Sequence, residues 1–152
     1  MRVTAKVDYA LRAALELAAA AGGPPIKGEA LADSQGIPLK YLENILLDLR
    51  RGGIVSSMRG AEGGYWLARP PDEVTVADII RAVEGPLANV RGERPETLDH
   101  GGAATYVREL WVATRASLRV VLEGTTLADL VAGELPEAAQ QLLEDDEAWV
   151  SH

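Results

Sequence analysis

Apolar residues recur at three- and four-residue spacing over the first fifty positions, as they do along the buried face of a helix. The stretch 5–20 has this pattern, and the Gly-Gly-Pro-Pro run after it predicts the helix end. A short helix over 27–34 and an amphipathic helix over 38–51 are predicted next, with a Gly-containing turn between them, which is the helix-turn-helix pattern. The predicted buried faces comprise Ala10, Leu11, Ala14, Leu15 and Ala18 in the first helix, and Leu42, Ile45, Leu46 and Leu49 in the third.

Two short runs of strand-forming residues, 54–58 and 65–68, directly follow the third helix. The sequence Arg-Gly-Ala-Glu-Gly-Gly joins them, and its glycines permit the positive φ angles of a tight hairpin. A hairpin in this place is typical of the wing of a winged helix-turn-helix. Two prolines at 70–71 then interrupt the chain, and a helix over about 75–84 is predicted to pack back onto the core.

The second half of the chain predicts a loop followed by a long helix. The stretch 86–102 has little periodicity and many turn residues, which indicates a long loop. From 103 to about 123 the apolar residues form a near-heptad stripe, which we interpret as the dimerisation surface of a helix. Packing of this stripe against the first helix of the same chain is the alternative. The stripe comprises Val107, Leu110, Trp111, Thr114, Leu118 and Val121.

The predicted fold class is mostly α with a small β-hairpin, a winged helix-turn-helix domain carrying a long dimerisation helix. A short helix capped by threonine is expected within 125–135. The tail 134–152 holds six acidic residues and no Lys or Arg, so we expect it to be disordered. The domains are then the winged helix-turn-helix over 1–85, the loop over 86–102, the dimerisation helix and short C-terminal helix over 103–133, and the acidic tail.

The charge is distributed unevenly along the chain, whose net charge is −8. Residues 1–70 hold nine basic against seven acidic side chains, whereas residues 71–152 hold six against sixteen. This asymmetry favours a nucleic-acid-binding face in the first half, with random scatter of surface charge as the alternative. The sequence shows neither an apolar run that could span a membrane nor a signal peptide, so we expect a cytoplasmic protein without a membrane partner.

Three stretches, in this order and spacing, resemble the Rrf2 family of bacterial transcription regulators. They read MRVTAKVDYALRAALELA, GIPLKYLENILLDLRRGGIVSSMRGAEGGYWLARPPDEVTVADIIRAVEGPL and TTLADLV. The resemblance is dense over 1–87 and looser over 104–132. It implies a homodimer with a winged helix-turn-helix and a long crossing helix, which represses or activates operons from palindromic operators.

The chain departs from the best-known family members in having no cysteine. The resemblance places three cysteines and an iron–sulfur cluster in the loop after AVEGP, where this chain reads ANVRGERPETLDHGG. Without thiolates that cluster chemistry is not carried over, and we expect neither a cofactor nor a metal. Asp8, which matches a cluster ligand of some relatives, is interpreted as a surface acid of the first helix. His100 with Glu93, Glu96 or Asp99 is a weak alternative metal site.

The candidate DNA-binding residues come from the helix-turn-helix and the wing. Asn44 is of the type that hydrogen-bonds adenine and Lys40 of the type that contacts guanine or phosphate, while Arg59 is predicted to enter the minor groove. A solvated helix face is the alternative, Tyr41 either contacts phosphate or covers the helix end, and Trp66 is expected to pack under the wing. The full set is Arg2, Lys6, Lys27, Gly28, Pro38, Leu39, Lys40, Tyr41, Asn44, Arg50, Arg51, Arg59, Gly60, Gly63, Gly64 and Tyr65.

The nature of any regulatory signal stays open between a small molecule, a partner protein and no effector. Arg91 and Arg94 are the cations of the loop and suit an anionic metabolite, with pairing to nearby acids as the alternative. No phosphate loop, metal signature or activated nucleophile is evident, so we expect no enzymatic activity. The alternative function is a winged-helix protein-interaction module that works through its acidic half.

Overall fold

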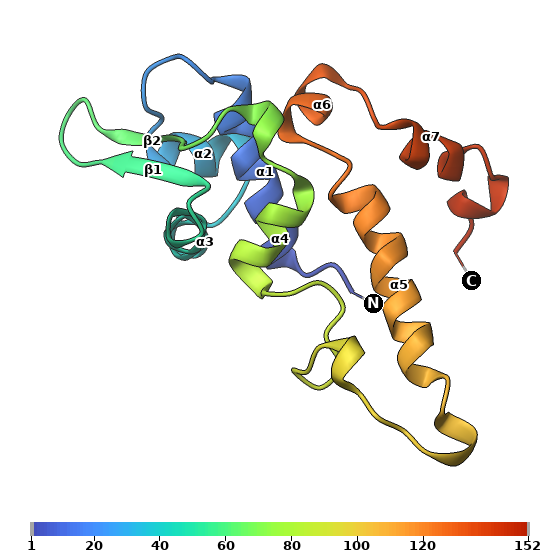
Figure 1. Ribbon diagram of the computed structural model, residues 1–152. Coiled ribbons are helices and arrows are strands. Elements are labelled where there is room, and N and C mark those ends of the chain that lie inside the picture. The colour runs from blue at the N-terminus through green and yellow to red at the C-terminus, as the bar shows by residue number, and fades with distance from the viewer. Residues whose placement is uncertain (1, 152) are drawn as a thin grey trace.

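The computed structural model describes residues 2–151 and shows a mostly helical molecule with one hairpin (Figure 1), which confirms the predicted fold class. Short 3-10 turns lie at Pro71–Glu73, Pro95–Thr97, Gly102–Ala104 and Asp146–Trp149. The helices are α1 (Ala5–Ala19), α2 (Gly28–Gln35), α3 (Leu39–Arg51), α4 (Val76–Glu84), α5 (Val107–Leu122), α6 (Leu127–Ala132) and α7 (Glu137–Leu143), and the strands are β1 (Val55–Met58) and β2 (Gly64–Leu67).

The core forms around α1, whose small side chains let its neighbours approach closely. Ala10, Ala13 and Ala14 have no solvent exposure, and α2, α3, α4 and the hairpin pack around them. All four apolar positions expected on the buried face of α3 are fully buried. The helix-turn-helix therefore has one shared core, which fixes the direction in which α3 presents its other face.

A third segment pairs with the edge of the hairpin, and the sequence pattern did not indicate it. β1 and β2 pair antiparallel, with Val55 opposite Leu67 and Met58 opposite Gly64. Ile26 then bridges to β2 through two backbone hydrogen bonds with Tyr65, of 2.9 and 2.8 Å. Because two strands alone are marginally stable, this third segment and the packing of Leu67 onto the core hold the hairpin in place.

The short helix α6 packs with α1, α2, α3, α4 and the hairpin, which together form the body of the molecule, although the sequence analysis grouped α6 with the long helix. Thr75 and Thr126, the residues before α4 and α6, form an antiparallel bridge. Next to it the Leu127 amide donates to the Val74 carbonyl, and the Leu127 side chain has no solvent exposure within the core. The division at residue 103 therefore does not follow the packing, because the chain returns to the body after α5.

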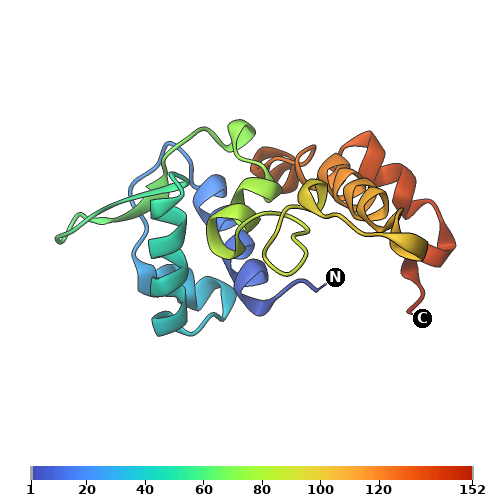
Figure 2. The same ribbon diagram turned by 60° about the horizontal axis from the view of Figure 1, so that its bottom comes forward.

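Helix α5 stands apart from this body on the side opposite the hairpin (Figures 1 and 2). None of its residues is buried. The preceding segment 86–102 lies along α5, with Pro95 and Leu98 buried. It contains the 3-10 turn Pro95–Thr97, and the turn Gly102–Ala104 begins at its last residue. No helix in the described part of the chain is long and apolar enough to cross a membrane.

The acidic tail differs from the disorder that its composition predicts. It folds into α7 and a final 3-10 turn, with Ala139 buried and the Trp149 indole donating to the Leu143 carbonyl at 3.0 Å. Pro136 directly precedes α7, and its carbonyl accepts from the amides of Ala139 and Gln140. The physical reason for the difference is that α7 packs against α5, which the charge count alone does not reveal.

Candidate DNA-binding surface

The face of α3 that points away from the core carries polar side chains, which are exposed to solvent. Lys40, Glu43, Asn44 and Arg51 are all exposed, while Leu47 is half-buried at the edge of this face. A helix fits the major groove of DNA, and lysine and asparagine are side chains that recognise base edges there. The structure therefore brings the predicted reading residues of α3 onto one surface.

The end of α3 is joined to the hairpin at that same surface. The Arg50 guanidinium donates to the Ser57 hydroxyl at 3.1 Å, which connects the last turn of α3 to β1. Between the two elements lies a hollow of about 400 Å³ that Asn44, Arg59 and Tyr65 help to line. Arg50 thus has a structural partner in addition to its predicted DNA contact, and Ser57 is a surface residue that the sequence pattern did not single out.

The tip of the hairpin is fixed by a lysine at the beginning of the helix-turn-helix. The Lys27 ammonium donates to the Gly60 carbonyl at 2.6 Å, and the Gly63 amide donates to the same carbonyl at 3.0 Å. Gly60 has a φ of +105°, a conformation that glycine adopts readily. Arg59 beside this turn is exposed and makes no ion pair or hydrogen bond with the residues that the structure describes.

Helices α2 and α3 both begin without a side-chain cap. A threonine hydroxyl caps α1, α4 and α6, whereas α2 begins after Lys27 and α3 after Pro38; α5 and α7 are likewise uncapped. Uncapped N-terminal amides favour anions such as phosphate. At the start of α2, a Cβ added to Gly28 would lie 3.5 Å from the Tyr65 ring, so glycine leaves room for this ring beside the helix end.

Tyr41 is held by aromatic packing at the start of α3. Its ring meets that of Tyr9 edge-to-face, with the ring centres 5.7 Å apart, and Arg12 lies 4.9 Å from the centre of the Tyr9 ring. Tyr41 remains partly exposed, so both of its predicted roles are compatible with its position. Asp8 pairs with Arg12 at 3.1 Å, consistent with a surface acid of α1.

Lys6 and Arg2 are predicted to contact the backbone of DNA. The Lys6 ammonium pairs with Asp48 at 2.9 Å and donates to the Val83 carbonyl at 2.8 Å, so its charge is used to join α1, α3 and α4. Arg2 is exposed and lies two positions before Thr4, whose hydroxyl donates to Glu84 at the end of α4. The Lys6 ammonium therefore lies between α1, α3 and α4 and is not part of the hollow that α3 forms with the hairpin.

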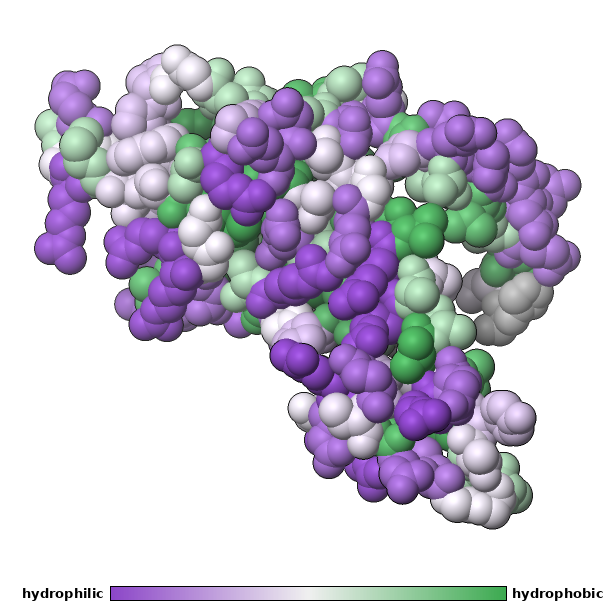
Figure 3. Space-filling view, viewed as in Figure 1, coloured by the Kyte–Doolittle hydropathy of each residue, from purple (hydrophilic) through white to green (hydrophobic). Residues whose placement is uncertain are grey.

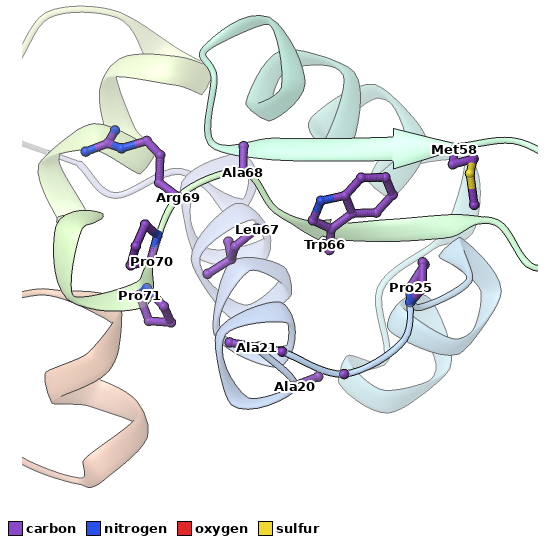
Figure 4. Close-up of a pocket in the computed structure, with 12 residues that line it drawn as sticks. Ala20, Ala21, Pro25, Met58, Trp66, Leu67, Ala68, Arg69, Pro70 and Pro71 are labelled. Carbon is purple, nitrogen blue, oxygen red and sulfur yellow. The ribbon is translucent and has the colours of Figure 1, made fainter.

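The back of the hairpin carries an apolar hollow of about 500 Å³ (Figure 4). Trp66 lies there with Met58, Pro25 and the Pro70–Pro71 pair, on the face of β2 opposite Tyr65. Trp66 is about one third exposed, so it covers the back of the wing without being enclosed. It takes no part in the hollow beside α3.

The predicted dimerisation residues divide into two groups on α5. Leu110 and Trp111 are 57% and 39% exposed, whereas Val107, Thr114, Leu118 and Val121 are half-buried. Val120, which lies one position off the predicted stripe, is 56% exposed. On α7, which packs against α5, Leu142 and Leu143 are also exposed.

The two loop arginines lie apart from each other. Arg91 has a φ of +53° and borders a hollow with Trp111, whereas Arg94 borders another hollow with arginines of α4 and α5. Glu96 pairs with Arg115 at 2.6 Å. A hydrogen bond with its own backbone, and then the one from Arg115, lowers the pKa of the Glu96 carboxyl. Among the described residues no three histidine or acidic side chains gather into a metal site.

Comparison with known proteins identifies the family. The model of the Rrf2 family, described as an iron-dependent transcriptional regulator, matches residues 3–133. The chain belongs to the Rrf2 family. This confirms the resemblance seen in the three sequence stretches, and it makes the protein a helix-turn-helix transcriptional regulator that binds DNA rather than an enzyme.

Relatives match along nearly the whole Rrf2 chain. A Mycobacterium tuberculosis H37Rv protein named as an HTH-type transcriptional regulator is 49% identical over 151 residues, 99% of this chain and 94% of its own. The solved structure of CymR, the global cysteine regulator of Bacillus subtilis, has a TM-score of 0.74 at 38% identity and covers 88% of this chain and 98% of its own. The structure of IscR from T. potens has a TM-score of 0.68 at 32% identity, over 100% and 93% of the two chains.

Proposed function

We propose that this Rrf2 protein is a cytoplasmic homodimer that represses transcription from a palindromic operator. Each α3 would occupy the major groove of one half-site, with Arg59 in the adjacent minor groove. Repression follows if the bound dimer covers promoter DNA that RNA polymerase needs. Two observations support the proposal: the exposed α3 face beside a fixed hairpin, and the unburied helix α5 on the opposite side.

The surface area of the single chain supports a dimer. A compact monomer of 16.2 kDa exposes about 7,500 Å², whereas this chain exposes 9526 Å². The excess of roughly 2,000 Å² per chain is of the size that obligate dimers cover. Leu110 and Val120 lie within this uncovered area on α5, so a second copy of the chain is the partner that we propose for it.

The positions of the reading elements support an operator with two-fold symmetry. The hairpin and α3 lie on the side of the body away from α5, so joining two chains through α5 leaves both reading surfaces outward (Figures 1 and 2). Two recognition helices in successive major grooves require half-sites one helical turn apart, roughly 34 Å. The loop 86–102 connects the body to α5, and the chain after α5 packs onto the body again through α6. These two connections together would set the distance between the two recognition helices.

The proposal is tested by removing the unpartnered cation of the wing. We expect Arg59→Ala to weaken binding to the DNA upstream of its own gene by roughly tenfold to a hundredfold, which corresponds to about 1–3 kcal/mol. Gel-shift titrations at fixed salt measure this. Arg91→Ala is the matched control, because it removes the same charge from the loop beside α5 and should leave the affinity unchanged. Equal affinities of Arg59→Ala and wild type would contradict a role of the wing in DNA binding.

A further inference from the structure

Positive charge is concentrated at one place in the otherwise acidic second half of the chain. Residues 71–152 hold only six basic side chains against sixteen acidic ones. Four of these six line a single hollow of about 440 Å³ where α4, the loop and α5 meet. Strongly hydrophilic side chains gather between α4 and α5 on the face shown in Figure 3. The four residues are Arg81 of α4, Arg94 of the loop, and Arg115 and Arg119 of α5.

The carboxylates around this hollow do not match the four guanidinium groups one for one. Arg115 pairs with Glu96, and Arg81 and Arg119 share Glu123. The Asp78 carboxylate lies 3.9 Å from the Arg81 guanidinium. It also pairs with Arg69 and accepts a hydrogen bond from the amide of Thr75, the residue before α4. Arg94 makes no close ion pair or side-chain hydrogen bond in the described part of the chain, although its charge helps to lower the pKa of the Glu96 carboxyl. The hollow therefore has unused guanidinium donors.

The chemistry of the wall determines which ligand it suits. A guanidinium group offers paired N–H donors that fit the oxygens of a phosphate or a carboxylate. Arg115 and Arg119 lie one helical turn apart on α5, and the Arg115 side chain is only 15% exposed, so its charge is partly shielded from water. A partly shielded positive charge attracts an anion more strongly than one fully in water.

We propose that this hollow binds a small metabolite with several anionic oxygens, in the form of phosphates or carboxylates. Arg94 and Arg115 hold the anion, with Arg81 and Arg119 completing the wall. Glu96 pairs with Arg115 in the absence of the ligand and therefore competes with the ligand for this guanidinium group.

The position of the hollow links this ligand to regulation. Arg81 belongs to the DNA-binding body, whereas Arg115 and Arg119 belong to α5, and the Arg81–Glu123 pair already connects the two. An anion held by both sides favours one angle between body and α5, and a ligand shifts an equilibrium by its preference for one arrangement. The effect on DNA affinity rests on the proposed homodimer; the binding of the anion does not.

The first experiment measures anion binding by the full chain without DNA. Isothermal titration at fixed ionic strength uses two probes, pyrophosphate for phosphate groups and succinate for carboxylates. We expect wild type to bind at least one probe with a Kd below about 1 mM. Arg94→Ala should weaken it roughly tenfold, and Arg91→Ala, which removes a loop cation outside this hollow, should leave it unchanged. Circular dichroism verifies that each variant is folded.

A second variant should change the affinity for the probe in the opposite direction. Glu96→Gln removes the competing carboxylate while keeping the shape of the side chain, so the same probe should bind a few-fold more tightly. A merely structural charge cluster would give no heat with either probe, or equal affinity in wild type and Arg94→Ala, and either result overturns the proposal. DNA titrations with and without the probe then test regulation, and a loss of that effect alone would contradict the dimer mechanism while leaving the anion site intact.

Discussion

At the scale of single residues, the hairpin depends on a close backbone approach at Gly64. Gly64 has a φ of +151°, and a Cβ placed on it would lie 2.6 Å from the Ile26 carbonyl oxygen. Since Ile26 supplies the third segment of the sheet, alanine at this position would strain its own backbone and displace Ile26. We expect Gly64→Ala to lower the free energy of unfolding by about 2–4 kcal/mol, measured by urea denaturation.

Gly60 provides the matched control for this change. It also has a positive φ, of +105°, but a Cβ there meets nothing within 4 Å. Gly60→Ala should therefore cost only the backbone strain, about 1 kcal/mol. Equal losses of stability in the two variants would show that the contact with Ile26 does not matter.

The sequence predicted the positions that require an unusual backbone conformation better than it predicted which charged side chains form ion pairs. The glycines of the wing were recognisable because the turn residues stand between two short strand-like runs. Lys6 was predicted to make a further contact with the DNA backbone. Its partner Asp48 is forty-two positions away, and nothing in the local pattern shows that α1 and α3 bring the two charges within 2.9 Å of each other.

At the scale of elements, α4 and α6 are two similar helices that begin side by side. Each starts with a threonine whose hydroxyl accepts the amide three residues later, from Asp78 or Asp129, and that aspartate accepts the threonine amide. The Thr75–Thr126 bridge joins the two beginnings. The short helix was predictable from its Thr-Leu-Ala-Asp start, but its place was not, because the bridge involves residues fifty-one positions apart.

The beginning of α6 should be sensitive to acid. Hydrogen bonds from the Thr126 amide first, and its side chain second, lower the pKa of the Asp129 carboxyl. A carboxyl with a lowered folded-state pKa contributes stability above its unfolded pKa, and this contribution is lost as the pH falls through the folded value. We therefore expect Asp129→Asn to lower Tm at pH 7 and to have a smaller effect near pH 3, below the ordinary aspartate range of about 4.

The control for this prediction removes the Thr126 side chain, the second of the two groups that lower the Asp129 pKa, and keeps the Thr126 amide. In a Thr126→Ala background the helix beginning lacks the reciprocal side-chain contact, so the pH-dependent part of the Asp129→Asn effect should shrink. Thermal melts followed by circular dichroism at both pH values compare the four proteins. An Asp129→Asn effect of the same size at pH 7 and pH 3 would contradict the assigned role of the ionised carboxyl.

At the scale of the whole molecule, the body was more predictable from the sequence than the surfaces beyond it. The buried faces of α1 and α3 repeat at helical spacing, so local periodicity was enough to find the core. The arginine hollow combines residues 81 to 119 from three segments, and no spacing rule brings them together. The tail was misjudged for a related reason, since its acidic composition suggested disorder while α7 packs against α5.

Dimerisation through α5 is tested by placing charge on its uncovered apolar positions. Leu110 and Val120 are each more than half exposed in the single chain, so aspartate at both positions should leave the fold intact. In the dimer, the same carboxylates would lose water without gaining partners, which costs several kcal/mol. We expect Leu110→Asp with Val120→Asp to raise the dimer dissociation constant more than about a hundredfold and to give monomers in sedimentation equilibrium.

The matched control for the dimer test lies on the hairpin. Met58 is 52% exposed, so Met58→Asp adds a charge at a similarly exposed apolar position far from α5, and this variant should sediment as a dimer. A folded double variant that remains dimeric would place the interface elsewhere. If the interface is right, the monomer should also lose most of its DNA affinity, because one half-site alone forfeits the second set of contacts that two-fold symmetry provides.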